Sequence, residues 1–477
     1  QKVNSRNPRS TVATSTELYD YLKLLWARVG KTISPISGKE VKKHSTTDVI
    51  EYILTLPEDT ALYICYKPKY DGEKNYLDVA LQKGYNRILY QGEILKIEKP
   101  DALMLITDPR YFTWVFSMEH EIRKNIPITY LNIWDDYPAP MYNRPFYEAC
   151  DLLMGISKQT VNINKIVLEE KAKDKVIKYI PHGLNPNTFF PLDKNHPDLK
   201  EFKKKIFKDK DPKFVLFFNS RNIRRKQIPD SLVAFKVFLD SLPKKEAKEC
   251  YFILHTEPIS THGTDLEAVK TYLFEDDYPD NVIFSTTKYP QKDLNCLYNL
   301  ADAQILLTSN EGWGLSLTEA LLVGNPIIAN VTGGMQDQMR FLDNDGKWFT
   351  PNADIPSNHR GTFKQHGKWA LPVYPSSISI QGSVPTPYIF DDRCDASDAA
   401  NQLLEAYNMG PQERKVRGSL GREWALSDEA GFTSEKMSYR VMEYIDTFLA
   451  EWKPREKFNL IKVDKPDSQL IPHNLEY

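Results

Sequence analysis

Cysteine is scarce in this sequence, and what the chain lacks excludes several classes of protein. The 477 residues include 5 cysteines, which stand far apart with no C-x-x-C pair. We therefore expect reduced thiols in a cytoplasmic protein, and no disulfide framework or zinc site. No apolar run approaches the roughly 18 residues of a membrane span, and the first residues lack a signal-peptide pattern. The formal net charge of −2 gives no overall attraction to nucleic acid or to an anionic membrane.

The second half of the chain alternates short apolar runs with helical patterns. The runs are "KFVLFFNS" (213–220), "CYFILHT" (250–256), "NVIFST" (281–286), "AQILLTS" (303–309) and "PIIAN" (326–330). Apolar runs of this length, separated by helices, are typical of a parallel sheet covered on both faces. With the right-handed crossover rule, they predict a doubly wound Rossmann-like domain over residues 206–429.

A fainter alternation over residues 100–205 predicts part of a second Rossmann-like domain. Its expected strands lie in 102–108, 128–136, 150–157 and 176–183, and four strands are few for such a domain. The turn-rich stretch 181–194 is a plausible hinge between the two domains. Residues 351–387 are rich in Pro, Ser and Gly, and we expect a long loop that is functional or mobile. The polar tail, 453–477, is left unassigned.

Residues 1–99 differ in character and predict a small α+β module. "STELYDYLKLLWARVG" is typical of an amphipathic helix with Ser15 or Thr16 as its cap. A second helix is expected within "SGKEVKKHSTTDVIEYILTLPEDT", after a basic loop. "GYNRILYQGEILKI" favours a hairpin around Gln91 and Gly92.

The stretch "SNEGWGLSLTEALLVGNPIIANVTGG" (309–334) places two carboxylates where a strand is followed by a helix. Ligands of open parallel sheets bind beyond the carboxyl ends of the strands, and Glu311 directly follows such an end. Glu319, one turn into the predicted helix, can accept hydrogen bonds from a pair of hydroxyls. Taken alone, Glu311 is equally well explained as an exposed loop charge and Glu319 as an acid near a helix start.

Backbone groups between the two glutamates predict an anion site. Gly312 and Gly314 allow the backbone to approach a ligand closely. The amides from Leu315 and Ser316 onward open the helix, at the positive end of its dipole. An anion beside carboxylates that bind hydroxyls indicates a sugar nucleotide.

Two cations support the same interpretation. Arg221 and Lys226 follow another predicted strand end and could neutralise a diphosphate as its charge develops. The neighbouring Arg224 and Arg225 are charged too, so a solvated basic loop explains the run equally well when it is considered alone.

These residues carry a family resemblance. "EGWGLSLTEALLVGNPIIANVTGG" resembles the glutamate–seven residues–glutamate motif of GT-B-fold retaining glycosyltransferases, family 4 in particular, and the likeness covers roughly residues 100–450. The resemblance implies two Rossmann-like domains, the first apparently incomplete here. Residues 419–449 resemble the family's carboxyl-terminal helices, so 430–452 are expected to cross back to the first domain.

The resemblance also implies roles for the site residues. Arg221 and Lys226 would bind the donor diphosphate. Glu319 would hold the ribose hydroxyls and Glu311 the transferred sugar, with Gly333 and Gly334 near the donor. The family's chemistry is a hexosyltransferase-type transfer with retention, without a required metal and with no cofactor besides the nucleotide-sugar donor.

The chain departs from the family pattern in its first domain. Many relatives carry His-Asp after a strand there, but this chain has Trp134 and Asp135 in "IWDDYP". Asp108, at another strand end, could face the cleft or be a turn residue. Glu311, Asp108 and Asp135 are the catalytic candidates, and we expect His182 to be structural.

The family's first strands and its Gly-rich acceptor loop are missing before residue 100. Residues 1–99 instead resemble UvrA, the ATPase subunit of bacterial excision repair, in a region that binds UvrB. The chain has no Walker A loop, ABC signature or zinc-binding cysteines, so UvrA-type ATPase activity is not expected. The sequence is therefore interpreted as a chimera whose transfer activity is impaired.

Three functions remain open from the sequence. The first is a glycosyltransferase acting on an unknown glycan, lipid-linked or protein acceptor. The second is a non-catalytic module that contacts UvrB or DNA through residues 1–99. The third is another GT-B enzyme, such as a sugar-nucleotide epimerase or a phosphorylase, and the Glu311/Glu319 pair favours the transferase over these.

Overall fold

The computed structural model describes residues 31–35, 38, 40–41, 45–57, 87–90, 93–96, 100–355, 358–359, 361–384 and 386–455. The chain divides between Lys99 and Pro100 into two units, which are treated separately below. No helix in these ranges is long and apolar enough to span a membrane.

The first unit contains two strand pairs and a helix. Strand β1 (Thr32–Ile33) pairs with β2 (Glu40–Val41), and β3 (Arg87–Tyr90) pairs with β4 (Glu93–Lys96), both antiparallel. Helix α3 (Thr46–Leu54) starts with a capping box in which Ser45 and Asp48 each accept the other's backbone N–H. The expected second helix and hairpin are confirmed, whereas the first expected helix lies outside the described residues.

The second unit begins with a four-stranded parallel sheet, in the order β5-β6-β7-β8. Its strands are β5 (Leu103–Ile106), β6 (Ile128–Asn132), β7 (Leu152–Gly155) and β8 (Val176–Tyr179). Between them lie η1 (Pro109–Phe112), α5 (Thr113–Phe116), α6 (Glu119–Ile122), η2 (Met141–Asn143), α7 (Arg144–Glu148), α8 (Lys158–Leu168) and η3 (Glu169–Asp174). All four strands predicted from the apolar runs are confirmed. We call this part the four-stranded half.

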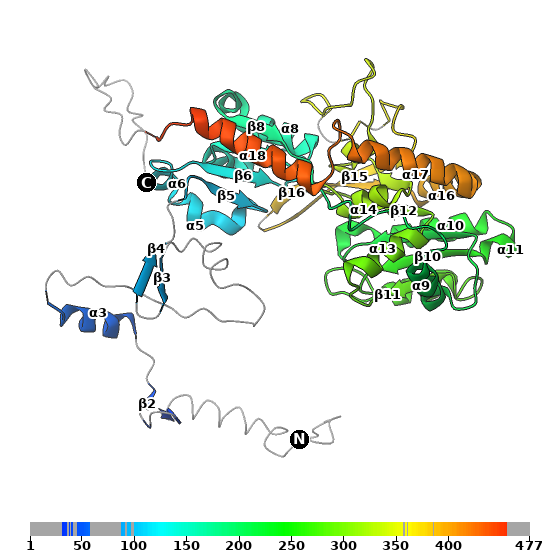
Figure 1. The fold of residues 1–477 in the computed structure, drawn as a ribbon, viewed down its shortest axis with the longest axis horizontal. Helices are drawn as coiled ribbons and strands as arrows, with labels where there is room; N and C mark the ends of the chain where they lie inside the picture. The colour runs from blue at the N-terminus through cyan, green and yellow to red at the C-terminus, as the bar shows by residue number, and fades with distance from the viewer. Residues whose placement is uncertain are drawn as a thin grey trace, which may run out of the picture. The chain divides into compact units, whose positions relative to one another are not determined.

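A six-stranded parallel sheet follows, in the order β11-β10-β9-β12-β13-β14. Its strands are β9 (Phe214–Asn219), β10 (Cys250–His255), β11 (Val282–Ser285), β12 (Ala303–Leu306), β13 (Ile327–Asn330) and β14 (Ala370–Val373). The helices are α9 (Pro197–Phe207), η4 (Arg224–Lys226), α10 (Ile228–Asp240), α11 (Lys244–Ala247), α12 (Leu266–Phe274), α13 (Gln291–Leu300), α14 (Leu315–Val323), α15 (Met335–Met339), α16 (Ala396–Asn408) and α17 (Gly410–Leu426). We call this part the six-stranded half (Figure 1).

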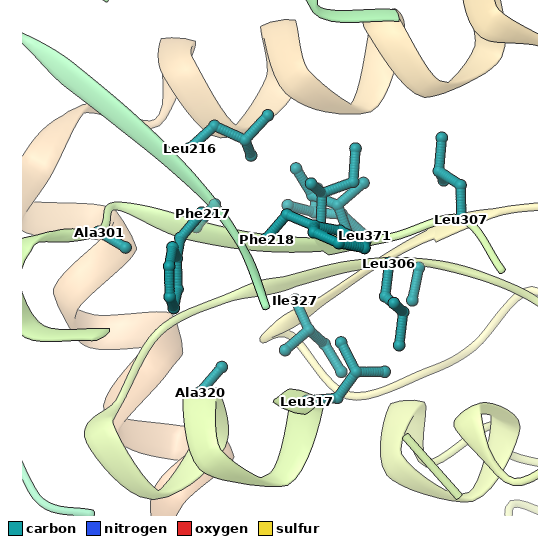
Figure 2. Close-up of a cluster of buried hydrophobic side chains, with 14 of the residues drawn as sticks. Leu216, Phe217, Phe218, Ala301, Leu306, Leu307, Leu317, Ala320, Ile327 and Leu371 are labelled. Carbon is teal, nitrogen blue, oxygen red and sulfur yellow. The ribbon is translucent and has the colours of Figure 1, made fainter. Parts of the chain in front are cut away.

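Helices cover both faces of the six-stranded sheet. Phe214 of β9 packs against Phe238 of α10, with ring centroids 5.7 Å apart, whereas Phe217 packs against Tyr298 of α13 at 4.8 Å. Positions 214 and 217 point to opposite faces of the strand. Figure 2 shows the apolar layer between β9, β12 and α14, including Leu306 and other fully or almost fully buried side chains. The doubly wound α/β fold expected from the sequence is confirmed.

The segment 351–387 corrects one expectation. It contains β14 at the edge of the six-stranded sheet and β15 (Pro375–Ser383), which forms an antiparallel hairpin with β16 (Thr386–Cys394). The expected long loop is therefore wrong from residue 370 onward. Proline is compatible with the first residue of a strand, and the Ser/Ile alternation of "SSISIQGS" suits a half-exposed hairpin.

The last helix, α18 (Ser434–Glu451), returns to the four-stranded half. The backbone N–H of Leu184 donates to Phe432 O (3.1 Å), and that of Ser434 donates to Leu184 O (2.9 Å). Farther along the helix, Lys178 Nζ of β8 lies 5.2 Å from the Tyr444 ring centroid. The two chain segments that connect the halves thus lie side by side.

Candidate donor-binding site

A cavity of about 890 Å³ lies beyond the carboxyl ends of both parallel sheets, where ligands of such sheets bind. The four-stranded half contributes to its lining Asp108, Arg110, Trp134, Asp135 and Asp136. The six-stranded half contributes Arg221, Arg225, Lys226, His255, Lys288, Glu311, Gly312, Gly314, Leu315, Ser316 and Glu319. The hairpin β15–β16 adds Thr386 and Ile389.

The loop between β12 and α14 is held in place by backbone packing. Gly314 has φ of 84° and precedes Leu315, the first residue of α14. The helix therefore begins where the sequence predicted. A Cβ on Gly333 would lie 2.1 Å from Glu311 O, and one on Gly334 would lie 2.1 Å from Gly312 O. These two glycines are absent from the cavity lining. Gly333 and Gly334 instead pack against the backbone of Glu311 and Gly312, and this close contact fixes the position of Glu311.

Glu311 is the centre of a buried charge cluster. Its Oε2 atom accepts hydrogen bonds from Lys226 Nζ and from Arg225 Nη1, the latter at 3.1 Å. Burial favours a raised pKa for Glu311, but the charges of Lys226 and Arg225 outweigh it and hold the pKa below its ordinary value. The carboxylate is therefore ionised at neutral pH.

Glu319 has a different environment. Its Oε2 atom accepts hydrogen bonds from the Tyr298 hydroxyl and from Asn219 Nδ2, the latter at 3.3 Å. Burial raises the pKa of Glu319 to about 7, although both hydrogen bonds oppose the shift. Within one cavity, one glutamate is held charged and the other lies close to its titration point.

Asp135 approaches this cluster from the four-stranded half. Its Oδ2 atom lies 3.9 Å from Arg225 Nη1. Burial raises the pKa of Asp135, opposed by Arg225 and reinforced by Glu311. The neighbouring Asp136 is also buried, and its pKa is raised well above the ordinary value. The charge of this acidic pair thus depends on a cation from the other half.

Asp108 both lines the cavity and caps a helix. Its side chain accepts the backbone N–H of Arg110 at 3.0 Å, at the start of η1, and forms an ion pair with the Arg110 guanidinium. Burial acts to raise the pKa of Asp108, but the bonds to Arg110 lower it below the ordinary value. Asp108 therefore fits both alternatives left open by the sequence, since it lines the cavity and caps the turn at the start of η1.

The predicted cations lie at the same cavity with different exposure. Arg221 is exposed, whereas Lys226 is buried. Burial lowers the pKa of His182, whose ring meets Trp313 edge to face at 6.4 Å. Among the residues that the structure describes, no group of three or more His, Cys, Asp or Glu side chains could hold a metal ion.

Arg225 was not singled out by the sequence. Its guanidinium donates to Asn310 O at 2.5 Å in addition to Glu311, and its own carbonyl accepts the N–H of Ser309 at 2.8 Å. The uninterrupted Arg224-Arg225-Lys226 run beside a strand end was the available signal. Thr386 was missed as well, because its segment was expected to be a loop. Ile389 lies just beyond that segment, where no strand was predicted.

Comparison with known proteins adds the family to this geometry. Residues 198–357 match the model of the family described as glycosyl transferases group 1. This match lies within the six-stranded half. Among solved structures, it resembles sucrose-phosphate synthase from Thermosynechococcus elongatus, with 18% identity and a TM-score of 0.51 over 79% of this chain and 76% of that one.

Two further solved structures share the fold of the two halves. Anabaena HepE in complex with UDP and glucose gives 14% identity and a TM-score of 0.52 over 72% of this chain and 78% of that one. An α,α-trehalose-phosphate synthase from Burkholderia xenovorans gives 12% and 0.52 over 73% of each chain. At these identities the likeness is one of fold, and it confirms the GT-B arrangement.

A second set of relatives matches another part of the chain. UvrABC system protein A of Bradyrhizobium diazoefficiens is 39% identical over 107 residues, which is 22% of this chain and 11% of that protein. The Clostridium tetani protein is 42% identical over 103 residues, again 11% of its length. The chain thus spans about a tenth of these relatives. It joins a UvrA-like segment to a glycosyl transferase region, as the sequence predicted.

Proposed function

We propose that this protein transfers a sugar from a nucleotide-sugar donor to a hydroxyl acceptor. The observation that carries the proposal is the cluster of Lys226, Arg225 and Glu311 in the same cavity as Glu319. Cations able to meet a diphosphate stand beside two carboxylates able to meet hydroxyls. The start of α14 opens on the same cavity and adds backbone N–H groups for an anion.

In this proposal each group has one task. Lys226 and Arg221 neutralise the diphosphate leaving group, which lowers the barrier to bond breaking without a required metal. Glu311 holds the transferred sugar, and Glu319 holds the ribose. Transfer proceeds with retention because the departing diphosphate helps to deprotonate the acceptor on the same face of the sugar. Asp108 and Asp135 face the acceptor side.

Donor binding is expected to survive better than transfer. The donor groups come from the six-stranded half, whereas the four-stranded half has few strands for a Rossmann-like domain. Thermal unfolding of the wild type and of Glu319→Ala, measured with each of a panel of nucleoside diphosphates, tests the donor site. A stabilisation that is lost in Glu319→Ala supports the proposal, and no response of the wild type to any nucleotide contradicts it.

Product analysis separates transfer from related reactions. Labelled sugar nucleotides, incubated with and without EDTA, should release nucleoside diphosphate and pass the label to an acceptor or to water. Release that needs an added divalent ion contradicts the metal-independent mechanism. Conversion to another sugar nucleotide without release identifies an epimerase.

We propose a separate role for residues 1–99 on the strength of the UvrA match. A region of this kind could bind UvrB independently of sugar transfer. Pulldown of purified UvrB by the full chain, with a variant lacking residues 1–99 as the control, tests the idea. Equal recovery by both proteins contradicts it.

A further inference from the structure

Two cations converge on one carboxylate oxygen in the cavity. Arg225 Nη1 and Lys226 Nζ both donate to Glu311 Oε2. The side chains of Lys226 and Glu311 are 9% and 12% exposed, and that of Arg225 is 32% exposed. The Lys226–Glu311 pair is nearly out of water, and Arg225, which lines the same cavity, is more exposed.

A diphosphate that engages Lys226 competes with Glu311 for the same ammonium group. If Lys226 turned to the ligand with no replacement, a buried carboxylate would lose its counter-charge, which is costly. Either another cation must remain on Glu311, or Glu311 must take up a proton as the diphosphate binds.

Arg225 is placed to be that remaining cation. A guanidinium has several N–H donors in a fixed fork, so it can hold more than one acceptor at a time. Arg225 is also anchored to Asn310 O at 2.5 Å, on the residue that precedes Glu311. The charged groups around the carboxylate are Lys226 and Arg225 from the six-stranded half and Asp135 from the four-stranded half.

We propose that Arg225 is a positioning residue that keeps the Glu311 carboxylate charged and in place when a diphosphate draws Lys226 away from it. This inference rests on the proposed function, because it assumes that Lys226 meets the donor diphosphate. In this scheme Lys226 and Arg225 are paired with Glu311 before the ligand binds. Binding then exchanges the Lys226–Glu311 ion pair for one between Lys226 and the diphosphate. The freed oxygen of Glu311 then becomes available to a sugar hydroxyl.

The test compares Arg225→Met with Arg224→Met. Arg224 is the matched control: it is the adjacent arginine, it is 56% exposed, and it pairs with Asp391 outside the cavity lining. Inorganic pyrophosphate is the probe, because it needs no knowledge of the base or sugar. Calorimetry at pH 6, 7 and 8, in buffers of different ionisation enthalpy, measures affinity and proton uptake together.

The expected result is specific to the exchange. At pH 8, Arg225→Met should bind pyrophosphate about tenfold more weakly than the wild type. The deficit should shrink toward pH 6, with about one more proton taken up than by the wild type. The ionisation of pyrophosphate itself cancels in this comparison. Arg224→Met should match the wild type in pyrophosphate affinity and proton uptake, because Asp391 keeps its hydrogen bonds from Ser309 and Asn310 and lies outside the cavity lining.

A second pair of variants separates positioning from folding. In a Glu311→Gln background there is no carboxylate charge to retain, so adding Arg225→Met should change pyrophosphate affinity less than twofold. Arg225→Lys should recover part of the affinity without extra proton uptake. Thermal unfolding of each variant establishes that the proteins compared are folded.

Three results would overturn the inference. They are unchanged affinity in Arg225→Met, an equal loss in the Glu311→Gln background, or a loss with no proton uptake. If the wild type binds neither pyrophosphate nor any nucleoside diphosphate, the proposed function itself fails. Those outcomes therefore distinguish an error about Arg225 from an error about the donor site.

Discussion

The two halves of residues 100–455 differ in how the acidic side chains that line their shared cavity are paired. In the six-stranded half, Glu311 has Lys226 and Arg225 as partners and Glu319 has Tyr298, all from that half. In the four-stranded half, Asp135 has its cation contact with Arg225 of the other half. Glu311 therefore has its counter-charges within its own half, whereas Asp135 has a cation contact from the other half.

The largest expected effect comes from a variant that disturbs the loop between β12 and α14 and leaves the four-stranded half unchanged. In Gly333→Ala the new Cβ would meet Glu311 O at 2.1 Å, on a backbone with φ of 54°. We expect a destabilisation of about 3 kcal/mol and loss of nucleoside diphosphate binding. Gly346→Ala is the control, since its φ of 74° is equally left-handed but no atom lies within 4 Å. Similar unfolding temperatures for the two variants would contradict the steric argument.

Paired acid-to-amide variants compare the two halves directly. Glu311→Gln should reduce transfer about 100-fold, because it removes a charge that holds the reacting sugar. Asp135→Asn should leave nucleoside diphosphate affinity within about twofold, because the donor contacts lie in the other half, and should reduce transfer about tenfold. Steady-state kinetics and calorimetry on both variants measure this split. Weak nucleotide binding by Asp135→Asn would show that the donor site is not self-contained.

The pH dependence of donor binding sharpens the contrast between the two glutamates. The pKa of Glu319 is raised from 4.5 to about 7. Its protonation therefore stabilises the folded protein fully below pH 4.5, and this contribution is lost as the pH rises through about 7. The ionised form accepts ribose hydroxyls better, so nucleoside diphosphate affinity should rise severalfold from pH 6 to pH 8 relative to Glu319→Gln. Calorimetry on both proteins cancels the ionisation of the nucleotide. Parallel pH profiles would contradict this assignment.

The smallest expected effect concerns the contact between the halves. The Tyr142 hydroxyl of the four-stranded half donates to Tyr388 O of the hairpin at 3.1 Å. Tyr142→Phe should cost about 1 kcal/mol, measured by thermal unfolding. Tyr439→Phe, at a position 68% exposed, should cost nothing measurable. An equal loss in both variants would remove the hairpin bond from the account.

The parallel strands and the loop that contains Glu311 could be predicted from the sequence because their signals are local. A buried parallel strand is a continuous apolar run, and Glu311 stands in the loop that follows one of them, β12. The predicted donor residues Arg221, Lys226 and Glu319 lie at the same cavity for the same reason. The carboxyl ends of parallel strands meet at one edge of the sheet.

Features that depend on distant residues escaped prediction. Arg225 resembles any solvated base until Asn310 and Glu311 are brought beside it. Asp391 and Asp392 resemble surface acids, yet they are only 1% and 2% exposed. Asp391 accepts hydrogen bonds from Ser309 and Asn310, whereas Asp392 accepts one from Thr332. No local pattern announces such partners.

The hairpin β15–β16 has a mechanical consequence for the molecule. The covalent connections between the halves run together, with Leu184 hydrogen-bonded to Phe432 and Ser434. The hairpin is anchored in the six-stranded half through Asp391, and it contacts the other half at Arg110, which lines the cavity, and at Tyr142 and Tyr137. Figure 1 shows β16 extending toward β5.

The hairpin is one of several noncovalent ties between the halves. The backbone N–H of Lys158 donates to Asp337 Oδ2 at 2.9 Å, and Asn162 Nδ2 donates to Asn352 O at 2.9 Å. Separation of the halves therefore requires the loss of these bonds as well as the hairpin's bonds to Arg110, Tyr142 and Tyr137.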